Sequence, residues 1–457
     1  MYSIHTFLLQ KELFRSPEPV KTTVVSSFTD TPALQQIARQ ADSDYILFYT
    51  GTSPIELHPY AIGRMYQIAE SNDGALFYSD YQEIRQGKKI HHPTLEYQTG
   101  SIRNDFDFGQ LLLFRNDSFQ QVVAQMNTDY RFAALYELRL SISRLGKIVH
   151  IPETLYTVQP TDLRLSGEKQ FDYVDPANRE VQLEMEAVCT AHLQAIGAWL
   201  APEFQRIDFG QENFAREASV IIPVRNRKRT IAEAVESALQ QQTDFSFNVI
   251  VVDNPSTDST GQILTELSRR YPNLIHHIPA STELGIGGCW TEAILLPECG
   301  KFAIQLDSDD LYKDCHVLQR IVDTFYQENC AMVIGSYQMV DFKLEEIPPG
   351  LIAHREWTPD NGRNNALRIN GLGAPRAFYT PVLRQIKFPN VSYGEDYATA
   401  LAISRKYPIA RIYDPLYLCR RWEENSDHDL DIQQLNNYNF YKDKIRTLEI
   451  QARISGK

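Results

Sequence analysis

The sequence predicts an α/β protein with a mostly parallel sheet, present as two tandem copies of which the first is incomplete. Three observations lead to this prediction. In the second half, β-branched apolar runs are separated by helical patterns of about 10–15 residues. Acidic residues follow two of these runs directly. Parts of the first half also repeat the second half at a nearly constant spacing, which is typical of a duplicated fold.

The second half supplies the strands and helices of the predicted sheet. Apolar runs without alternation indicate buried strands, and apolar residues at helical spacing indicate the helices between them. The expected strands are SVIIPV (219–224), NVIVVD (248–253), IHHIPA (275–280) and FAIQL (302–306). The expected helices are TIAEAVESALQQ (230–241), GQILTELSRRY (261–271) and CWTEAILL (289–296). Strands joined by such helices form crossover units and pair in parallel.

Acidic residues stand at the carboxyl ends of two expected strands. Asp253 ends one strand, while Asp307, Asp309 and Asp310 follow another. Each group alone fits a solvated turn, since aspartate is a common turn residue. Because ligands of parallel sheets bind beyond the carboxyl ends of the strands, the two groups together favour a binding site. Several carboxylates at one place are typical of a site for a divalent cation.

A second acidic pair, Glu395 and Asp396, precedes the helical pattern YATALAISRKY. Two interpretations remain open for this pair. Asp396 caps the free amides at the start of the helix, or it is a functional carboxylate.

Composition limits the class of protein. A hydrophobic fraction of 43% and a formal net charge of −13 fit a globular protein and argue against nucleic-acid binding. No apolar run is long enough for a transmembrane segment, and the N-terminus does not have the pattern of a signal peptide. The six cysteines form no C-x-x-C pair, so a reduced, cytoplasmic location is expected.

Four stretches, taken in order, make the second half recognisable: IIPVRNRKRTIAEAVESALQQ, VIVVDNPSTDST, LDSDD and GEDYATAL. Together they resemble the inverting nucleotide-sugar glycosyltransferases of family 2, over roughly residues 218–430. The resemblance implies the GT-A fold, a Rossmann-like α/β fold, and a UDP- or GDP-sugar as donor. It implies a saccharide acceptor, either a glycan or a lipid-linked saccharide met at the membrane surface by peripheral association.

The resemblance also implies roles for individual residues. Asp307 and Asp309 match the D-x-D pair and would bind Mn²⁺ or Mg²⁺, with His428 as a further metal ligand. Asp396 matches the catalytic base of the E-D pair, beside Glu395. Residues expected to bind the donor are Asp253, which would meet its base, and Pro223, Arg225, Gly287 and Asp307. Residues expected near the acceptor or the diphosphate are Arg376, Arg421 and Trp422.

The first half resembles the second at matching positions. SDYILFYTGTSPIEL (43–57) aligns with GKFAIQLDSDDLYKD (300–314), and LYELRLSISR (135–144) aligns with DYATALAISR (396–405). Thr50 and Thr52 then replace the D-x-D aspartates, and Leu135 replaces the base. This half is therefore expected to be a copy without the metal site, the base or the nucleotide half.

The predicted domains follow from this repeat. They are a degenerate copy (1–165), a helical linker (166–217), a catalytic domain (218–430) and a C-terminal helical tail (431–457). Two alternatives to an active transferase remain: a non-catalytic glycan-binding scaffold of two such domains, and a nucleotidyltransferase. The second would need a glycine-rich phosphate loop after the first strand, where RNRKR has no glycine.

Overall fold

The computed structural model describes residues 2–159, 178–210, 212–422 and 430–456. The chain divides into two units, each with its own mixed sheet. The first unit comprises Met1–Trp199, Leu367–Ile369 and Leu430–Lys457, and the second comprises Leu200–Ala366 and Asn370–Asp429. These divisions differ in detail from the domain limits expected from the sequence, which stay predictions.

The second unit contains a sheet with the order β12-β11-β10-β13-β17-β15-β18-β14, and β16 pairs with β15. Its strands are β10 (Ala218–Val224), β11 (Phe247–Asp253), β12 (Leu274–His277), β13 (Phe302–Gln305), β14 (Leu311–Tyr312), β15 (Met332–Val340), β16 (Glu346–Ile352), β17 (Arg376–Tyr379) and β18 (Ile409–Arg420). The strands β12, β11, β10 and β13 are parallel neighbours. The predicted α/β fold is confirmed. The strands β15 and β18 also pair in parallel, whereas β17 pairs antiparallel with β13 and β15.

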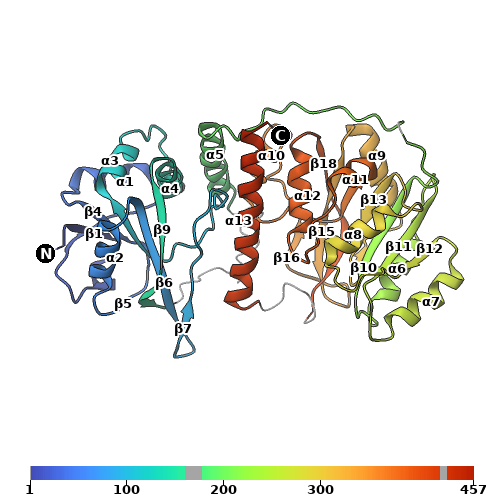
Figure 1. Ribbon diagram of the computed structural model, residues 1–457, viewed down its shortest axis with the longest axis horizontal. Coiled ribbons are helices and arrows are strands. Elements are labelled where there is room, and N and C mark those ends of the chain that lie inside the picture. The colour runs from blue at the N-terminus through green and yellow to red at the C-terminus, as the bar shows by residue number, and fades with distance from the viewer. Residues whose placement is uncertain (1, 160–177, 211, 423–429, 457) are drawn as a thin grey trace. The chain divides into compact units, whose positions relative to one another are not determined.

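Helices connect the parallel strands of the second unit (Figure 1). The connecting helices are α6 (Ile231–Leu239), α7 (Thr260–Arg270) and α8 (Ile286–Leu295). The unit also contains α9 (Val317–Glu328), α10 (Gly362–Asn365), α11 (Thr380–Ile386) and α12 (Glu395–Ser404). The helical spacing in α6 has the predicted effect, because Ile231, Ala234, Val235 and Ala238 share one buried face. The strands β10 and β11 are buried on both faces, as a parallel sheet covered by helices requires.

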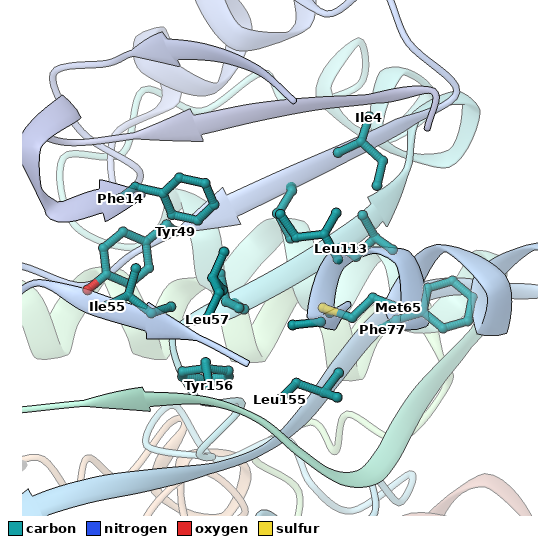
Figure 2. Packing of buried hydrophobic residues seen from close by; sticks show 14 of the residues in the cluster. Ile4, Phe14, Tyr49, Ile55, Leu57, Met65, Phe77, Leu113, Leu155 and Tyr156 are labelled. Carbon is teal, nitrogen blue, oxygen red and sulfur yellow. The ribbon is translucent and has the colours of Figure 1, made fainter. Parts of the chain in front are cut away.

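The first unit contains a sheet with the order β2-β5-β9-β6-β8-β4-β1-β3, and β7 pairs with β6. Its strands are β1 (Ile4–Leu8), β2 (Phe14–Arg15), β3 (Lys21–Val24), β4 (Tyr45–Tyr49), β5 (Ile55–Leu57), β6 (Gly74–Arg85), β7 (Lys88–His92), β8 (Leu111–Arg115) and β9 (Lys147–Val158). Its helices are η1 (Lys11–Leu13, 3-10), α1 (Thr31–Gln40), α2 (Ala61–Glu70), α3 (Asn116–Val123), α4 (Ala134–Leu145), α5 (Arg179–Ala195) and α13 (Ile432–Ile454). The core on one face of the sheet includes Tyr49, Leu57, Met65, Phe77 and Leu113 (Figure 2).

The two sheets share one strand order and one set of directions. The series β3-β1-β4-β8-β6-β9-β5 corresponds to β11-β10-β13-β17-β15-β18-β14, and each pair of neighbours has the same parallel or antiparallel sense. The stretch GALFYSDYQ (74–82) aligns with AMVIGSYQM (331–339) at the same spacing as 43–57 with 300–314, which matches Ser79 to Ser336. Both serines are fully buried and lie where the register of a long strand shifts. The first sheet has no strand corresponding to β12 within the described residues. The duplication remains a prediction, which this shared topology supports.

The helices α5 and α13 both belong to the first unit. The helix α5 was expected to connect the two copies, and it lies within the first unit. In α13, Asp443 accepts a hydrogen bond from Ser101 and forms ion pairs with Arg103 and Arg446, all buried. Among the described residues, no helix has the length and apolar character needed to cross a bilayer.

Candidate functional site

The candidate site begins at the carboxyl ends of β10, β11 and β13. The strand β10 pairs in parallel with both neighbours, so the residues that follow these strands lie at one edge of the sheet. Val224 at the end of β10 is paired with Asp253, and Asp307 follows β13 after one residue. The prediction that the two acidic groups share an edge of the sheet follows from this topology.

Asp253 is held in one orientation by its neighbours. Its Oδ1 accepts hydrogen bonds from the backbone N–H of Ser256 (3.2 Å) and from its hydroxyl (2.6 Å), and its Oδ2 lies 3.3 Å from His276 Nε2. Burial alone would raise the pKa of Asp253, but the contacts with His276 and Ser256 hold it below its usual value. The side chain is thus a buried carboxylate, able to accept hydrogen bonds from a ligand.

Asp253 also lines a hollow of about 540 Å³ between α7 and the edge strand β12. Pro223 and Arg225, predicted with Asp253 to bind the donor, lie at the end of β10; Pro223 is half-buried and Arg225 is exposed. The other residues that line the hollow are Pro255, Ser256, Asp258, Gly261, Gln262, Thr265, Glu266, Arg269, His276 and Ile278. A hollow of this size can accommodate a nucleoside.

The acidic cluster after β13 contains two half-buried residues, Asp307 and Asp309, and one buried residue, Asp310. Burial raises the pKa of Asp307, and burial together with the charges of Asp309 and Asp307 raises that of Asp310 well above its usual value. Asp310 accepts a hydrogen bond from the backbone N–H of Arg420 (2.8 Å). These directions show that the folded chain disfavours three negative charges here, as expected for carboxylates that require a cation.

Asp309 contacts one aromatic and one cationic side chain. Its Oδ2 accepts a hydrogen bond from Trp422 Nε1 (3.1 Å) and lies 3.8 Å from Arg227 Nε. Neither contact could be expected from the sequence, since Trp422 is 113 residues away and reaches Asp309 through the pairing of β14 with β18. Arg421, predicted with Trp422, is the neighbouring residue and is half-buried.

The carboxylates of Asp307 and Asp309 have the chemistry that Mn²⁺ and Mg²⁺ require. Magnesium sites commonly use one or two protein carboxylates, and substrate phosphates complete the shell. Within the described parts of the chain, no group of three or more histidine, cysteine or acidic side chains could hold a metal ion. Two carboxylates fit a cation that a phosphate ligand also binds. His428, predicted as a further ligand, lies outside the described residues.

Asp396 and Glu395 occupy the first turn of α12. Gly394, with a left-handed conformation (φ 78°), is the N-cap and offers no side chain. Asp396 Oδ2 forms an ion pair with Arg376 Nη2 at 3.0 Å. Glu395 is only 8% exposed, and burial followed by the charge of Asp396 raises its pKa to about 8. The two adjacent carboxyl groups therefore have different surroundings, one buried with a raised pKa and one paired with an arginine, which is the usual arrangement for distinct acid–base roles.

Arg376 and Gln305 join the acidic cluster to Asp396. Although burial opposes its charge, the carboxylates of Asp396, Asp307 and Glu395 raise the pKa of Arg376. Gln305 Nε2 donates to both oxygens of Asp307 (2.9 and 3.1 Å), and its Oε1 accepts from the backbone N–H of Arg376 (3.1 Å). One feature of the sequence distinguishes Gln305: it is an amide inside an apolar strand, two residues before the first aspartate, and the structure buries it.

Gly287 lies apart from the open side of the site. A Cβ there would lie 2.0 Å from Pro389 O and 2.9 Å from Glu395 Cβ, and its backbone N–H donates to Val391 O (2.9 Å). The glycine permits α8 to pack closely against the segment before α12 and against Glu395. A direct contact of Gly287 with the donor stays a prediction.

Comparisons with known proteins agree with the resemblance seen in the sequence. The family model for glycosyl transferase family 2 matches residues 219–386. A poly(ribitol-phosphate) beta-glucosyltransferase of Bacillus spizizenii is 25% identical over 230 residues, which are 49% of this chain and 35% of that protein. The minor teichoic acid biosynthesis protein GgaA of Bacillus subtilis is 33% identical over 111 residues, 23% of this chain and 24% of that protein.

A structural relative is also known. The crystal structure of S. aureus TarS 1-349 in complex with UDP-GlcNAc has 23% identity and a TM-score of 0.40, and the match covers 52% of this chain and 72% of that chain. The chain spans about a third or less of the length of the two curated relatives named above. The residues of the candidate site from Pro223 to Arg376 lie inside the span matched by the family model. Residues 219–386 of the second unit therefore match glycosyl transferase family 2.

Proposed function

We propose that the second unit transfers a sugar from a nucleoside-diphosphate sugar to an acceptor hydroxyl, with inversion and with the help of Mn²⁺ or Mg²⁺. The observation that carries this proposal is the connected set Asp307–Gln305–Arg376–Asp396. It joins carboxylates suited to a phosphate-bound cation with a carboxylate suited to proton transfer. A non-catalytic scaffold would have no need for this connection.

The donor would lie along the carboxyl ends of the parallel strands. The oriented carboxylate of Asp253 can accept a hydrogen bond from a ring N–H of the base, which uracil and guanine both offer. The hollow beside it supports this position for a UDP- or GDP-sugar. Asp309 and Asp307 would bind the cation, which neutralises the charge that develops on the departing diphosphate.

Asp396 would act as the base in a single displacement. The acceptor hydroxyl gives its proton to the carboxylate as its oxygen attacks the anomeric carbon opposite the diphosphate, and the configuration is inverted. The ion pair with Arg376 holds Asp396 in place. Glu395, protonated near neutral pH, adds no second negative charge beside it.

The acceptor would be a hydroxyl on a phosphate-containing glycan or polyol chain. The names of two relatives, a poly(ribitol-phosphate) glucosyltransferase and a teichoic acid biosynthesis protein, support this class. It is narrower than the glycan or lipid-linked saccharide expected from the sequence. Attachment of such a chain to a membrane lipid would bring the protein to a membrane surface.

The first unit would be a copy of the same fold without the chemistry. Thr50 and Thr52 follow β4 where Asp307 and Asp309 follow β13, and Leu135 occupies the place on α4 that Asp396 has on α12. The shared strand order supports this proposal. Such a unit would bind the acceptor or stabilise the protein without catalysing transfer.

Replacement of Asp396 by asparagine tests the proposed reaction. The Asp396→Asn variant should keep its affinity for UDP or GDP and lose turnover by about 10²-fold or more, the usual scale for a general base. Release of UDP or GDP from a panel of UDP- and GDP-sugars gives the turnover, and calorimetry gives the affinity. The exposed Asp414→Asn is the matched control. Full turnover in Asp396→Asn, or wild-type protein that binds nucleotide sugars and transfers none, would contradict the proposal.

A further inference from the structure

Beside Asp309 lies an arginine–aromatic cluster that the proposed reaction does not use. Its rings are Phe342 and Trp422, with centroids 5.3 Å apart. The guanidinium carbon of Arg229 lies 5.1 Å from the Trp422 centroid and 5.7 Å from that of Phe342. Arg420 lies over Phe342 at 5.0 Å, and Arg227 lies over Trp422 at 5.7 Å. The loop after β10 and the end of β18 thus bring three guanidinium groups to two aromatic rings.

The three arginines differ in how their charge is balanced. Arg420 is buried and forms an ion pair with Glu233, and Arg227 lies 3.8 Å from a carboxylate oxygen of Asp309. Arg229 is exposed and, within the described residues, has no carboxylate partner. The formal net charge of the chain is −13, so the guanidinium of Arg229 is a local positive charge on a protein of negative net charge. Such a group attracts an anion.

The stacked position of Arg229 suits the binding of a phosphate group. A guanidinium that lies over aromatic rings keeps its N–H edge available, and that edge matches two oxygens of a phosphate. Phe342 is 40% exposed and offers an apolar face to the C–H groups of a sugar or polyol. A phosphate flanked by polyol carbons satisfies both features.

Two phosphate groups could reach this cluster: the donor diphosphate and a phosphodiester of the acceptor. Arg227 lies beside Asp309, where the cation and the diphosphate are expected. Arg229 follows Arg227 by two residues, and its guanidinium lies over Trp422 and Phe342. We propose that Arg229 and Phe342 bind a phosphodiester of the acceptor chain, beside the unit that receives the sugar. This inference rests on the proposed function and names the part of the acceptor that the site recognises.

Binding of a fluorescently labelled poly(ribitol phosphate) oligomer to the full chain tests the inference without requiring turnover. Arg229→Ala and Phe342→Ala should each weaken oligomer binding by about tenfold, the scale of one hydrogen bond to a charged group or one aromatic contact. Arg229→Lys should recover only part of the affinity, since it keeps the charge and loses the paired N–H edge. Their affinity for UDP with Mn²⁺ should change by less than about twofold. Lys228→Ala, an exposed cation on the same loop, is the matched control.

The possible results separate this inference from the proposed function. Weaker binding of UDP in Arg229→Ala, with oligomer affinity unchanged, would assign the cluster to the donor diphosphate and overturn the inference. Unchanged affinity for both ligands, equal losses in the Lys228→Ala control, or no binding of the oligomer by wild-type protein would also overturn it. Arginine-dependent binding of the oligomer by a protein that transfers no sugar would support the inference and contradict the proposed function.

Discussion

Replacement of Glu395 by glutamine should remove a loss of stability at high pH. Glu395 is 8% exposed, and its Oε2 has no hydrogen-bond partner among the described residues. Its pKa is raised from 4.5 to about 8, first by burial and then by the charge of Asp396. Between these two values the unfolded chain has released the proton and the folded chain retains it. The free energy of unfolding therefore falls as pH rises through this interval, and the loss is complete above the folded pKa.

The size of this effect follows from the width of the interval. About 3.5 pH units, at about 1.4 kcal/mol per unit, correspond to about 5 kcal/mol. Glutamine has nearly the same shape and does not ionise, so the stability of Glu395→Gln should lack this dependence. For a unit of this size 1 kcal/mol changes the melting temperature by about 2–4 °C. The variant should therefore melt about 10 °C or more above the wild type at pH 8.5, and at nearly the same temperature at pH 5.

Thermal melting between pH 4.5 and 9 measures this difference, and the exposed Glu298→Gln serves as the control. Parallel melting curves of the wild type and Glu395→Gln across the whole range would refute the reasoning. That result would mean that Glu395 is ionised in the folded protein and that water or Arg376 stabilises its charge.

Two further predictions concern the acidic cluster. Asp309→Ala should abolish the Mn²⁺- or Mg²⁺-dependent part of UDP or GDP binding. Asp310→Asn should have a milder effect because Asp310 already accepts a backbone hydrogen bond. Calorimetry with and without metal measures both, and wild-type binding that is equally strong without metal would contradict the prediction. Gln305→Leu should weaken metal-dependent nucleotide binding by about tenfold or more, since Asp307 loses the amide that donates to both its oxygens, and one hydrogen bond to a charged group is worth about 1.5–3 kcal/mol. Gln338→Leu is the control and should keep the wild-type affinity. The same affinity in Gln305→Leu as in this control would show that Gln305 does not position Asp307.

The sequence predicted the parallel strands closely because their burial depends on local pattern. The runs expected at 219–224 and 248–253 are β10 (Ala218–Val224) and β11 (Phe247–Asp253), each longer by one residue. Apolar β-branched residues indicate such strands whatever surrounds them. The edge occupied by the acidic groups followed from parallel pairing alone, without knowledge of any side-chain contact.

The contacts that orient these side chains could not be predicted in the same way. Gln305 bridges Asp307 and Arg376 only because β17 is inserted beside β13, and Trp422 reaches Asp309 only because β18 pairs with β14. Both depend on pairing between strands far apart in sequence, which a local pattern does not encode.

The raised pKa values explain why the same fold can exist with and without the acidic cluster. In the second unit, burial and like charge disfavour ionised Asp307 and Asp310, so the cluster lowers the stability of the folded chain until a cation or ligand balances it. In the first unit, Thr50 follows a strand whose residues are all buried, and its backbone N–H donates to Gln110 O (3.0 Å). The strands stabilise the sheet, whereas the residues just beyond them determine its chemistry. A sheet with this strand order that does not carry the acids, as in the first unit, therefore lacks this source of instability.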